Sequence, residues 1–119
     1  MYLGNCTLLY GAPGCRVSFL AVHIDSCNTN SLMGWVSDYA DRYRLPLWIT
    51  EWSCQAASFG RPLADHLSYM TAALPLLDAS PLVFRYAWMA ARSANRGLVQ
   101  DVARGGTTLT ALGEAYNNL

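Results

Sequence analysis

The sequence predicts an α/β protein built from parallel strand–helix units, and three observations lead to that fold class. Three short apolar runs suit buried strands, the segments between them carry apolar residues at helical spacing, and the two kinds of segment alternate along the chain. Such alternation is typical of parallel sheets. The 119 residues fit one modest domain, and an apolar content of 53% allows a packed core.

The first strand and helix are expected between residues 17 and 46. Residues 17–24 are apolar nearly throughout, which suits a strand buried on both faces. Polar residues 28–31 then offer several N-caps for a helix. Its apolar positions keep helical spacing and are Leu32, Val36, Tyr39 and Tyr43. Pro46 ends this segment.

Two further strand–helix units follow. Residues 47–51 predict the second strand, and its helix carries apolar residues from Leu63 to Leu77, with Pro75 expected to kink or shorten the last turn. Residues 82–88 predict the third strand. A glycine-rich loop then leads to a short helix over about residues 109–116, with Thr108 or Thr110 near its start. Residues 1–16 are left unassigned.

Composition argues against several classes of partner. Eight basic and eight acidic residues balance to zero, so the basic footprint of a nucleic-acid-binding protein is absent. The apolar stretches fall well short of the roughly 20 residues that a membrane-spanning helix needs. Four cysteines form no CxxC pair and lack histidines at ligand spacing, so we expect no zinc site and no other metal. No cofactor is implied.

Each predicted strand finishes in a residue that can do chemistry. The first ends in His23, the second in Glu51 and Trp52, and the third in Tyr86 and Trp88. We expect Glu51, His23 and Trp88 to converge on one face at the same edge of the sheet. Active sites of α/β barrels lie at the carboxyl ends of the strands, but a complete barrel has eight strands and about 250 residues. The chain is therefore either a small α/β sandwich or part of a larger barrel.

Simple alternation along a strand predicts which side chains share a face. If Glu51 points into a barrel, Leu47 and Ile49 point with it, while Trp48 and Thr50 face the helices. The same argument places two further sets on one face each: Phe19, Ala21 and His23 in the first strand, and Phe84, Tyr86 and Trp88 in the third.

Four segments together carry a resemblance to a known family. They are residues 19–23 (FLAVH), 46–52 (PLWITEW), 85–88 (RYAW) and 109–113 (LTALG). In order and approximate spacing they resemble the glycosyl hydrolase catalytic core family, glycoside hydrolase family 128, whose known members are β-1,3-glucanases. The resemblance covers about residues 15–117. It implies that residues 1–119 are a partial catalytic domain, strands six to eight of a (β/α)₈ TIM barrel, with Glu51 as the nucleophile of a retaining mechanism.

The chain departs from the family pattern at two points. Ile24 and Asp25 stand where the family has an aromatic pair after the strand-six histidine. The family's general acid/base, a glutamate in an Asn-Glu-Pro-type motif after strand four, has no counterpart, because Glu114 in the last helix is the only other glutamate. Retaining glycosidases need two carboxyl groups about 5–5.5 Å apart. We therefore expect this chain alone to be inactive.

Every candidate site residue has a structural alternative. Glu51 could instead pair with an arginine in a loop, and His23 could be a buried core histidine rather than a partner of the nucleophile or of a sugar hydroxyl. Asp25 would offer a second carboxylate near His23, although a loop aspartate is usually solvated. The residues expected to contact the sugar with their rings, or else to pack in the core, are Trp52, Tyr86 and Trp88.

Two cysteines follow the chemical strand ends closely. Cys27 comes four residues after His23, and Cys54 three residues after Glu51. Because both lie in loops leaving neighbouring strands at the same edge, we expect a Cys27–Cys54 disulfide, which would argue for an oxidising, extracytoplasmic location. Cys6 and Cys15 are left unassigned.

The function that the resemblance implies is retaining hydrolysis of β-1,3-glucan or a related cell-wall polysaccharide, by an extracellular or cell-wall protein. The alternative is a non-catalytic carbohydrate-binding or cell-surface protein derived from a degenerate barrel, which would keep the aromatic residues without the acid/base. The substrate polysaccharide is the one partner that the sequence implies. Linkage preference, endo or exo action and oligomeric state are left open.

Overall fold

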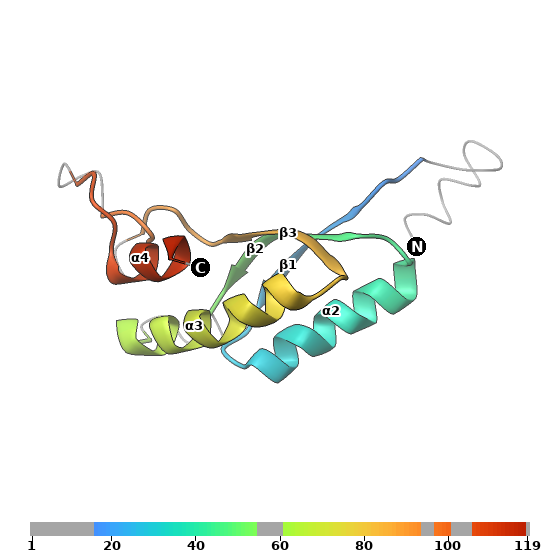
Figure 1. Cartoon of the computed structure of the whole chain (residues 1–119), viewed down its shortest axis with the longest axis horizontal. Coiled ribbons are helices and arrows are strands. Elements are labelled where there is room, and N and C mark those ends of the chain that lie inside the picture. Colours follow the sequence, from blue (N-terminus) through green and yellow to red (C-terminus); the bar gives the residue numbers. More distant parts are fainter. Residues whose placement is uncertain (1–15, 55–60, 94–96, 101–105, 119) are drawn as a thin grey trace.

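The three predicted strands form one parallel sheet. The computed structural model describes residues 16–54, 61–93, 97–100 and 106–118. Strands β1 (Leu20–Asp25), β2 (Leu47–Ser53) and β3 (Val83–Trp88) lie in the order β1-β2-β3, and both pairings are parallel. Helices α2 (Thr29–Tyr43) and α3 (Leu63–Ala79) cover one face of the sheet (Figure 1). The short helix α4 (Ala111–Asn117) follows β3 and packs against α3. The predicted βα order is confirmed.

The helices begin where the sequence offers caps. The side chain of Asn28 accepts a hydrogen bond from the Ser31 amide at 3.0 Å and starts α2. Thr110 does the same for α4, because its hydroxyl accepts from the Gly113 amide at 3.1 Å. Pro75 does not shorten α3, which continues to Ala79. Pro75 is exposed near the helix end, and the buried residues on either side hold that turn against the sheet.

Two β-bulges interrupt the regular register of the sheet. Between β1 and β2, Val22 pairs with Ile49 but His23 pairs with Glu51, so Thr50 is an extra residue in β2. Between β2 and β3, Leu47 pairs with Val83 but Trp48 pairs with Arg85, which makes Phe84 the extra residue in β3. A bulge puts two successive side chains opposite one, and every later residue in the strand changes face relative to simple alternation.

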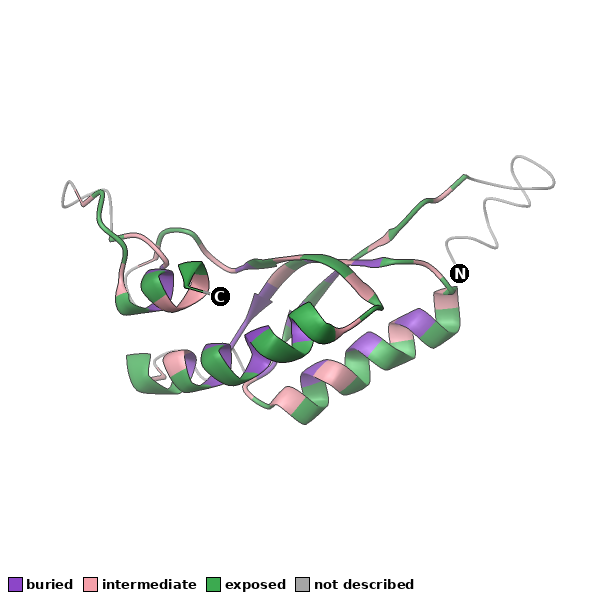
Figure 2. Cartoon of the chain, in the orientation of Figure 1, coloured by how far each residue is buried: buried purple, intermediate pink, exposed green. Residues whose placement is uncertain are grey.

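The sheet consequently has a helix-covered face and an open face. Leu47, Ile49 and Trp52 are fully buried under the helices, and Val22 and Ile24 are nearly so. Figure 2 shows buried positions on the strands and on the helices that cover them. The residues that alternate with those five along the strands point to the other side of the sheet and are more exposed. We call that side the open face. It carries, among others, Phe19, Ala21, His23, Trp48, Thr50, Glu51, Phe84 and Arg85.

The expected distribution of side chains was therefore right for the first strand and wrong for the other two. Phe19, Ala21 and His23 share the open face as predicted. Leu47 and Ile49 face the helices instead of accompanying Glu51, because the bulge at Thr50 moves Glu51 to the opposite face. The bulge at Phe84 likewise separates this residue from Tyr86 and Trp88, which turn toward α3. In the described part of the chain, no helix has both the length and the apolarity to cross a membrane.

Candidate functional site

His23 and Glu51 meet on the open face near the carboxyl ends of β1 and β2. They are register partners, and Nδ1 of His23 lies 3.5 Å from Oε2 of Glu51. Their side chains are 62% and 43% exposed, so a ligand resting on the open face could contact both. The sequence predicted this convergence from the strand ends alone. In chemical terms the pair offers a carboxylate nucleophile or base beside an imidazole that can donate a hydrogen bond.

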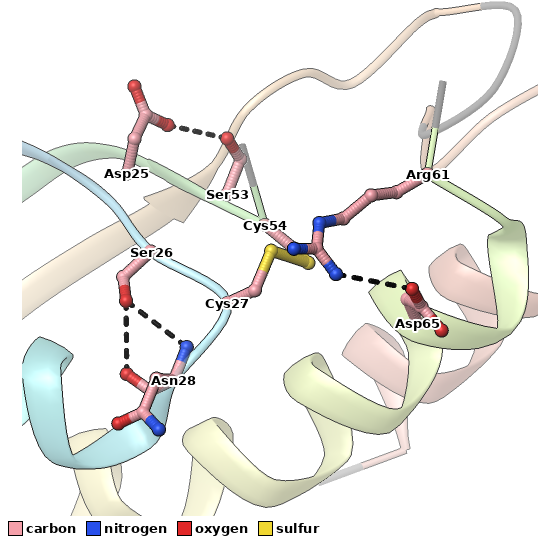
Figure 3. The surroundings of a disulfide bond; sticks show 8 residues. All are labelled: Asp25, Ser26, Cys27, Asn28, Ser53, Cys54, Arg61 and Asp65. Atoms are coloured by element: carbon pink, nitrogen blue, oxygen red, sulfur yellow. Dashed lines mark hydrogen bonds and ion pairs between the residues drawn. A yellow bond between two sulfur atoms is a disulfide. The ribbon is translucent and has the colours of Figure 1, made fainter. Parts of the chain in front are cut away.

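A second polar pair extends the same row toward the strand ends. Asp25 and Ser53 are register partners, and the Ser53 hydroxyl donates a hydrogen bond of 2.6 Å to the Asp25 carboxylate (Figure 3). Asp25 is exposed, whereas Ser53 is fully buried. Asp25 lies two positions after His23 in β1 and therefore on the same face, so the open face carries a second carboxylate within about 7 Å of rise. Asp25 is thus the last residue of β1 rather than a loop residue, and its exposed carboxylate is held by Ser53.

The predicted disulfide lies just beyond these pairs, at the carboxyl ends of β1 and β2. Cys27 and Cys54 are bonded, with their α-carbons 4.3 Å apart, and they join the loop after β1 to the end of β2 (Figure 3). Beside the bridge, Ser26 and Asn28 shape the turn into α2, because the Ser26 hydroxyl donates to the Asn28 carbonyl and accepts from the Asn28 amide. The bridge fixes the two strand ends that present His23 and Glu51. Cys6 and Cys15 lie outside the described residues.

The predicted aromatic contacts with sugar do not gather around Glu51. Trp52 is fully buried, and its ring meets Tyr69, Tyr86 and Trp88 edge-on at centroid distances of 5.7, 6.1 and 4.7 Å. Trp88 is only 5% exposed and packs near His66 of α3. In this arrangement neither indole offers a free ring face to a pyranose, and the expectation that Trp88 shares a face with Glu51 is wrong.

Tyr86 is likewise directed toward the helices. Its hydroxyl donates a hydrogen bond of 2.6 Å to Asp78 of α3, and its ring meets Tyr116 of α4 edge-on. Burial and the Asp78 carboxylate together raise the pKa of Tyr86. Tyr86 is therefore a structural link between β3 and α3, on the side of the sheet opposite Glu51.

The aromatic residues that do lie on the open face were not among the predicted sugar contacts. Phe19, Trp48 and Phe84 stack across the three strands, with centroids 4.3 and 6.1 Å apart and interplanar angles of 18°. One signal could have revealed them. Two polar residues separate Ile49 from Trp52, so simple alternation would put these two apolar side chains on opposite faces. Burying both on one face requires an extra residue in the strand.

Within the described residues, no group of three His, Cys, Asp or Glu side chains could hold a metal ion.

This geometry is that of a barrel segment with a carboxylate at the end of its middle strand, and comparison with known proteins identifies the class. The family of the glycosyl hydrolase catalytic core matches residues 1–116. The chain belongs to that family. The match agrees with the resemblance in the four segments and with the parallel βα order of the fold.

A curated relative and several solved structures fit the same family. Alkali-sensitive linkage protein 1 of Schizosaccharomyces pombe (strain 972 / ATCC 24843) is 33% identical over 78 residues, covering 64% of this chain and 14% of that protein. A glycoside hydrolase family 128 (subgroup II) endo-β-1,3-glucanase from Sorangium cellulosum is 30% identical with a TM-score of 0.72, covering 91% of this chain and 43% of the enzyme.

Two more distant structures share the fold. The subgroup I endo-β-1,3-glucanase of Amycolatopsis mediterranei, solved with laminarihexaose, has a TM-score of 0.79 at 24% identity, covering 98% of this chain and 51% of the enzyme. A subgroup VII oligosaccharide-binding protein from Trichoderma gamsii has a TM-score of 0.72 at 20% identity, covering 93% of this chain and 45% of that protein. The chain thus spans about half of these structures and a seventh of the curated relative.

Proposed function

We propose that this chain supplies the nucleophile-bearing half of a retaining glycoside hydrolase that acts on β-1,3-glucan. The observation that carries the proposal is the position of Glu51, half-exposed on the open face beside His23 at the carboxyl ends of parallel strands. Membership of the family and the likeness to endo-β-1,3-glucanases support the reaction and the substrate class.

The chemistry requires a second carboxyl group. Glu51 would attack the anomeric carbon while the glycosidic C–O bond breaks and an acid protonates the leaving oxygen, and water would then hydrolyse the glycosyl-enzyme ester. His23 could hold the Glu51 carboxylate in its attacking orientation by donating from Nδ1. Asp25 is the second carboxylate on the described open face, but Ser53 holds it in a row beside Glu51 on the same sheet. We assign the acid to the part of the barrel that this chain does not contain.

The location of the protein follows from the disulfide. A Cys27–Cys54 bridge persists in oxidising compartments. We therefore place the protein outside the cytoplasm, where a cell-wall glucan would be accessible.

The test restores the barrel and removes the nucleophile. The full chain is fused behind the part of the Amycolatopsis mediterranei glucanase that lies outside the match, and hydrolysis of laminarin is measured. Glu51→Ala and Glu51→Gln should nearly abolish turnover. Azide should partly rescue Glu51→Ala and give a glycosyl azide of inverted configuration, because a small anion fits the space left by the carboxylate.

Three results would count against the proposal. Turnover that survives Glu51→Ala would make Glu51 a structural carboxylate. Hydrolysis by the 119-residue chain alone would mean that a residue of this chain provides the acid, and Asp25 would be the first candidate. Laminarin binding without hydrolysis in the fused barrel would favour the alternative of a carbohydrate-binding protein, of which the Trichoderma gamsii structure is an example of the same fold.

A further inference from the structure

The carboxylate of Asp25 has a fixed position at the carboxyl edge of the open face. Asp25 is the last residue of β1 and pairs in register with Ser53, the last residue of β2. Ser53 is fully buried, and its hydroxyl donates to Oδ1 of Asp25 at 2.6 Å. The two strands are still hydrogen-bonded at this point, because the Ser26 amide donates to the Ser53 carbonyl at 3.0 Å. The direction of the carboxylate is therefore set before a ligand arrives.

The second oxygen of this carboxylate is open to a ligand. Figure 3 shows Asp25 with one oxygen turned to Ser53 and the other directed away from it. The ion pairs in the described part of the chain join other residues, such as Arg61 and Asp65, and none includes Asp25. The residue is exposed. A carboxylate that is held by one neutral donor can accept further hydrogen bonds from a ligand without giving up that donor.

Asp25 stands near Glu51 but is displaced along the sheet. It lies one strand across, a spacing of about 4.8 Å, and two residues farther along, a rise of about 7 Å. The two catalytic carboxyl groups of a retaining glycosidase are only about 5–5.5 Å apart. A sugar ring whose anomeric carbon lies at Glu51 carries its hydroxyls over the larger displacement. Asp25 is therefore placed to meet a hydroxyl rather than the glycosidic oxygen.

We infer that Asp25 is a specificity-determining residue that accepts a hydrogen bond from a hydroxyl of the glucosyl unit bound over Glu51. The inference deepens the proposed function and rests on it. A carboxylate is an acceptor only, so it selects a hydroxyl that donates, and the charge strengthens the bond. A site built to bond a hydroxyl rejects an analogue that lacks it, because its own polar group is then left unpaired. Ser53 is a positioning residue, which acts through Asp25.

A purely structural role, in which Asp25 ties β1 to β2, explains less of the geometry. The backbone ladder and the Cys27–Cys54 bridge, with α-carbons 4.3 Å apart, already join the two strand ends. The Ser53 hydrogen bond instead holds an exposed negative charge on the same face as Glu51, although like charges repel. Asp25 also stands where the chain departs from the family pattern, so the contact would be particular to this chain.

The experiment measures sugar binding in the fused barrel described above rather than turnover. Glu51→Gln prevents cleavage, and the affinity for laminaritriose is determined by calorimetry with and without a change at Asp25. Asp25→Ala should weaken binding by roughly ten- to hundredfold, the effect of losing one hydrogen bond to a charged group. Asp25→Asn, whose amide oxygen can still accept from Ser53, should lose less. Asp41→Ala, at an exposed aspartate of α2, is the matched control and should bind like the parent.

Ligand analogues separate a sugar contact from a structural effect. In each analogue of a laminaritriose series, fluorine replaces one hydroxyl of the sugar, which removes the donor and nearly preserves the size. One analogue should bind the parent barrel about tenfold more weakly than laminaritriose and show no such loss in Asp25→Ala. Ser53→Ala should weaken laminaritriose binding several-fold in the parent and not at all in Asp25→Ala, as a positioning role requires.

Three outcomes would overturn the inference. The first is an affinity for laminaritriose, or a lack of it, that Asp25→Ala leaves unchanged. The second is a lower melting temperature of Asp25→Ala with equal losses for every analogue, which would make Asp25 a structural link. The third is a loss of turnover in Asp25→Asn as complete as that in Glu51→Gln, which would make Asp25 the acid. Turnover that survives Glu51→Ala would reject the proposed nucleophile alone, because the comparison of affinities does not depend on it.

Discussion

His23 and Glu51 face each other across neighbouring parallel strands, with Nδ1 of the histidine 3.5 Å from Oε2 of the glutamate. The bulge at Thr50 creates this relationship, since without the extra residue Glu51 would point toward the helices. The Thr50 hydroxyl secures the bulge by donating to the Val22 carbonyl at 3.4 Å. The position of the proposed nucleophile thus depends on an irregularity of the strand.

We predict that His23 positions the Glu51 carboxylate in the fused barrel. His23→Ala should lower kcat with laminarin by roughly ten- to hundredfold, the effect of losing one hydrogen bond to a charged group, which the 3.5 Å contact of Nδ1 with Oε2 would become once substrate is bound. KM should change little, because the imidazole would act on the nucleophile more than on bound sugar. His23→Asn retains a side-chain N–H close to the Nδ1 position and should recover part of the loss. An equal rise in KM for both variants would instead make His23 a sugar ligand.

The sequence was sufficient to predict the order of elements and the meeting of His23 with Glu51, although β1 and β2 continue past their predicted ends, to Asp25 and Ser53. Apolar runs, helical spacing and caps such as Asn28 are local signals, and local signals determine which segments form strands and helices. The faces of β2 and β3 were not predictable by alternation, because a single extra residue reverses every later side chain. Phe84 and Trp52 show the consequence: the first lies exposed on the open face and the second is buried under the helices.

The disulfide was predictable and the sugar-contacting aromatic residues were not, for a related reason. The Cys27–Cys54 pairing depends only on two loops leaving adjacent strands at one edge, and parallel topology guarantees that proximity. The role of an aromatic residue depends on which face it occupies. Trp52 and Trp88 lie at the carboxyl ends of β2 and β3, yet both are buried near α3.

The Cys27–Cys54 bridge should stabilise the fold substantially. The two cysteines are 27 residues apart, and the loop entropy removed from the unfolded chain corresponds to roughly 3–4 kcal/mol. Cys27→Ser should reduce the free energy of unfolding by about that amount in urea titrations. Dithiothreitol should destabilise the parent chain similarly while leaving Cys27→Ser unaffected. A variant as stable as its parent would show that the bridge does not constrain the unfolded chain.

Trp52 should behave as a core residue. Trp52→Ala removes a fully buried indole that contacts three aromatic rings, and we expect a loss of about 3–5 kcal/mol in the free energy of unfolding. Trp52→Phe should cost far less, because the indole N–H has no hydrogen-bond partner in the described residues and phenylalanine removes that buried donor. Trp35→Ala is the control, since Trp35 is 51% exposed on α2. Comparable losses for Trp35→Ala and Trp52→Ala would contradict the core assignment.

Alkaline pH should unfold the protein through its tyrosines. Burial raises the pKa of Tyr69, Tyr86 and Tyr116. The carboxylate of Asp25 raises the pKa of Tyr69 further, and that of Asp78 does the same for Tyr86 and Tyr116. The folded state therefore keeps these phenols protonated above pH 10, where unfolded tyrosines ionise. Their stabilising contribution is fully present below about pH 10 and is lost as pH rises further, because the folded state then binds more protons than the unfolded state.

Urea midpoints measured from pH 8 to pH 11 test this dependence. The chain has no lysine, so few other groups titrate in that window, and any free thiols are alkylated beforehand. The midpoint should fall steeply above pH 10 in the parent protein and less steeply in Tyr86→Phe, which removes one of the raised phenols together with its hydrogen bond to Asp78. Asp78→Asn should also flatten the fall, since it removes the negative charge that opposes ionisation of Tyr86. A slope that is unchanged in both variants would show that Tyr86 does not link proton binding to folding.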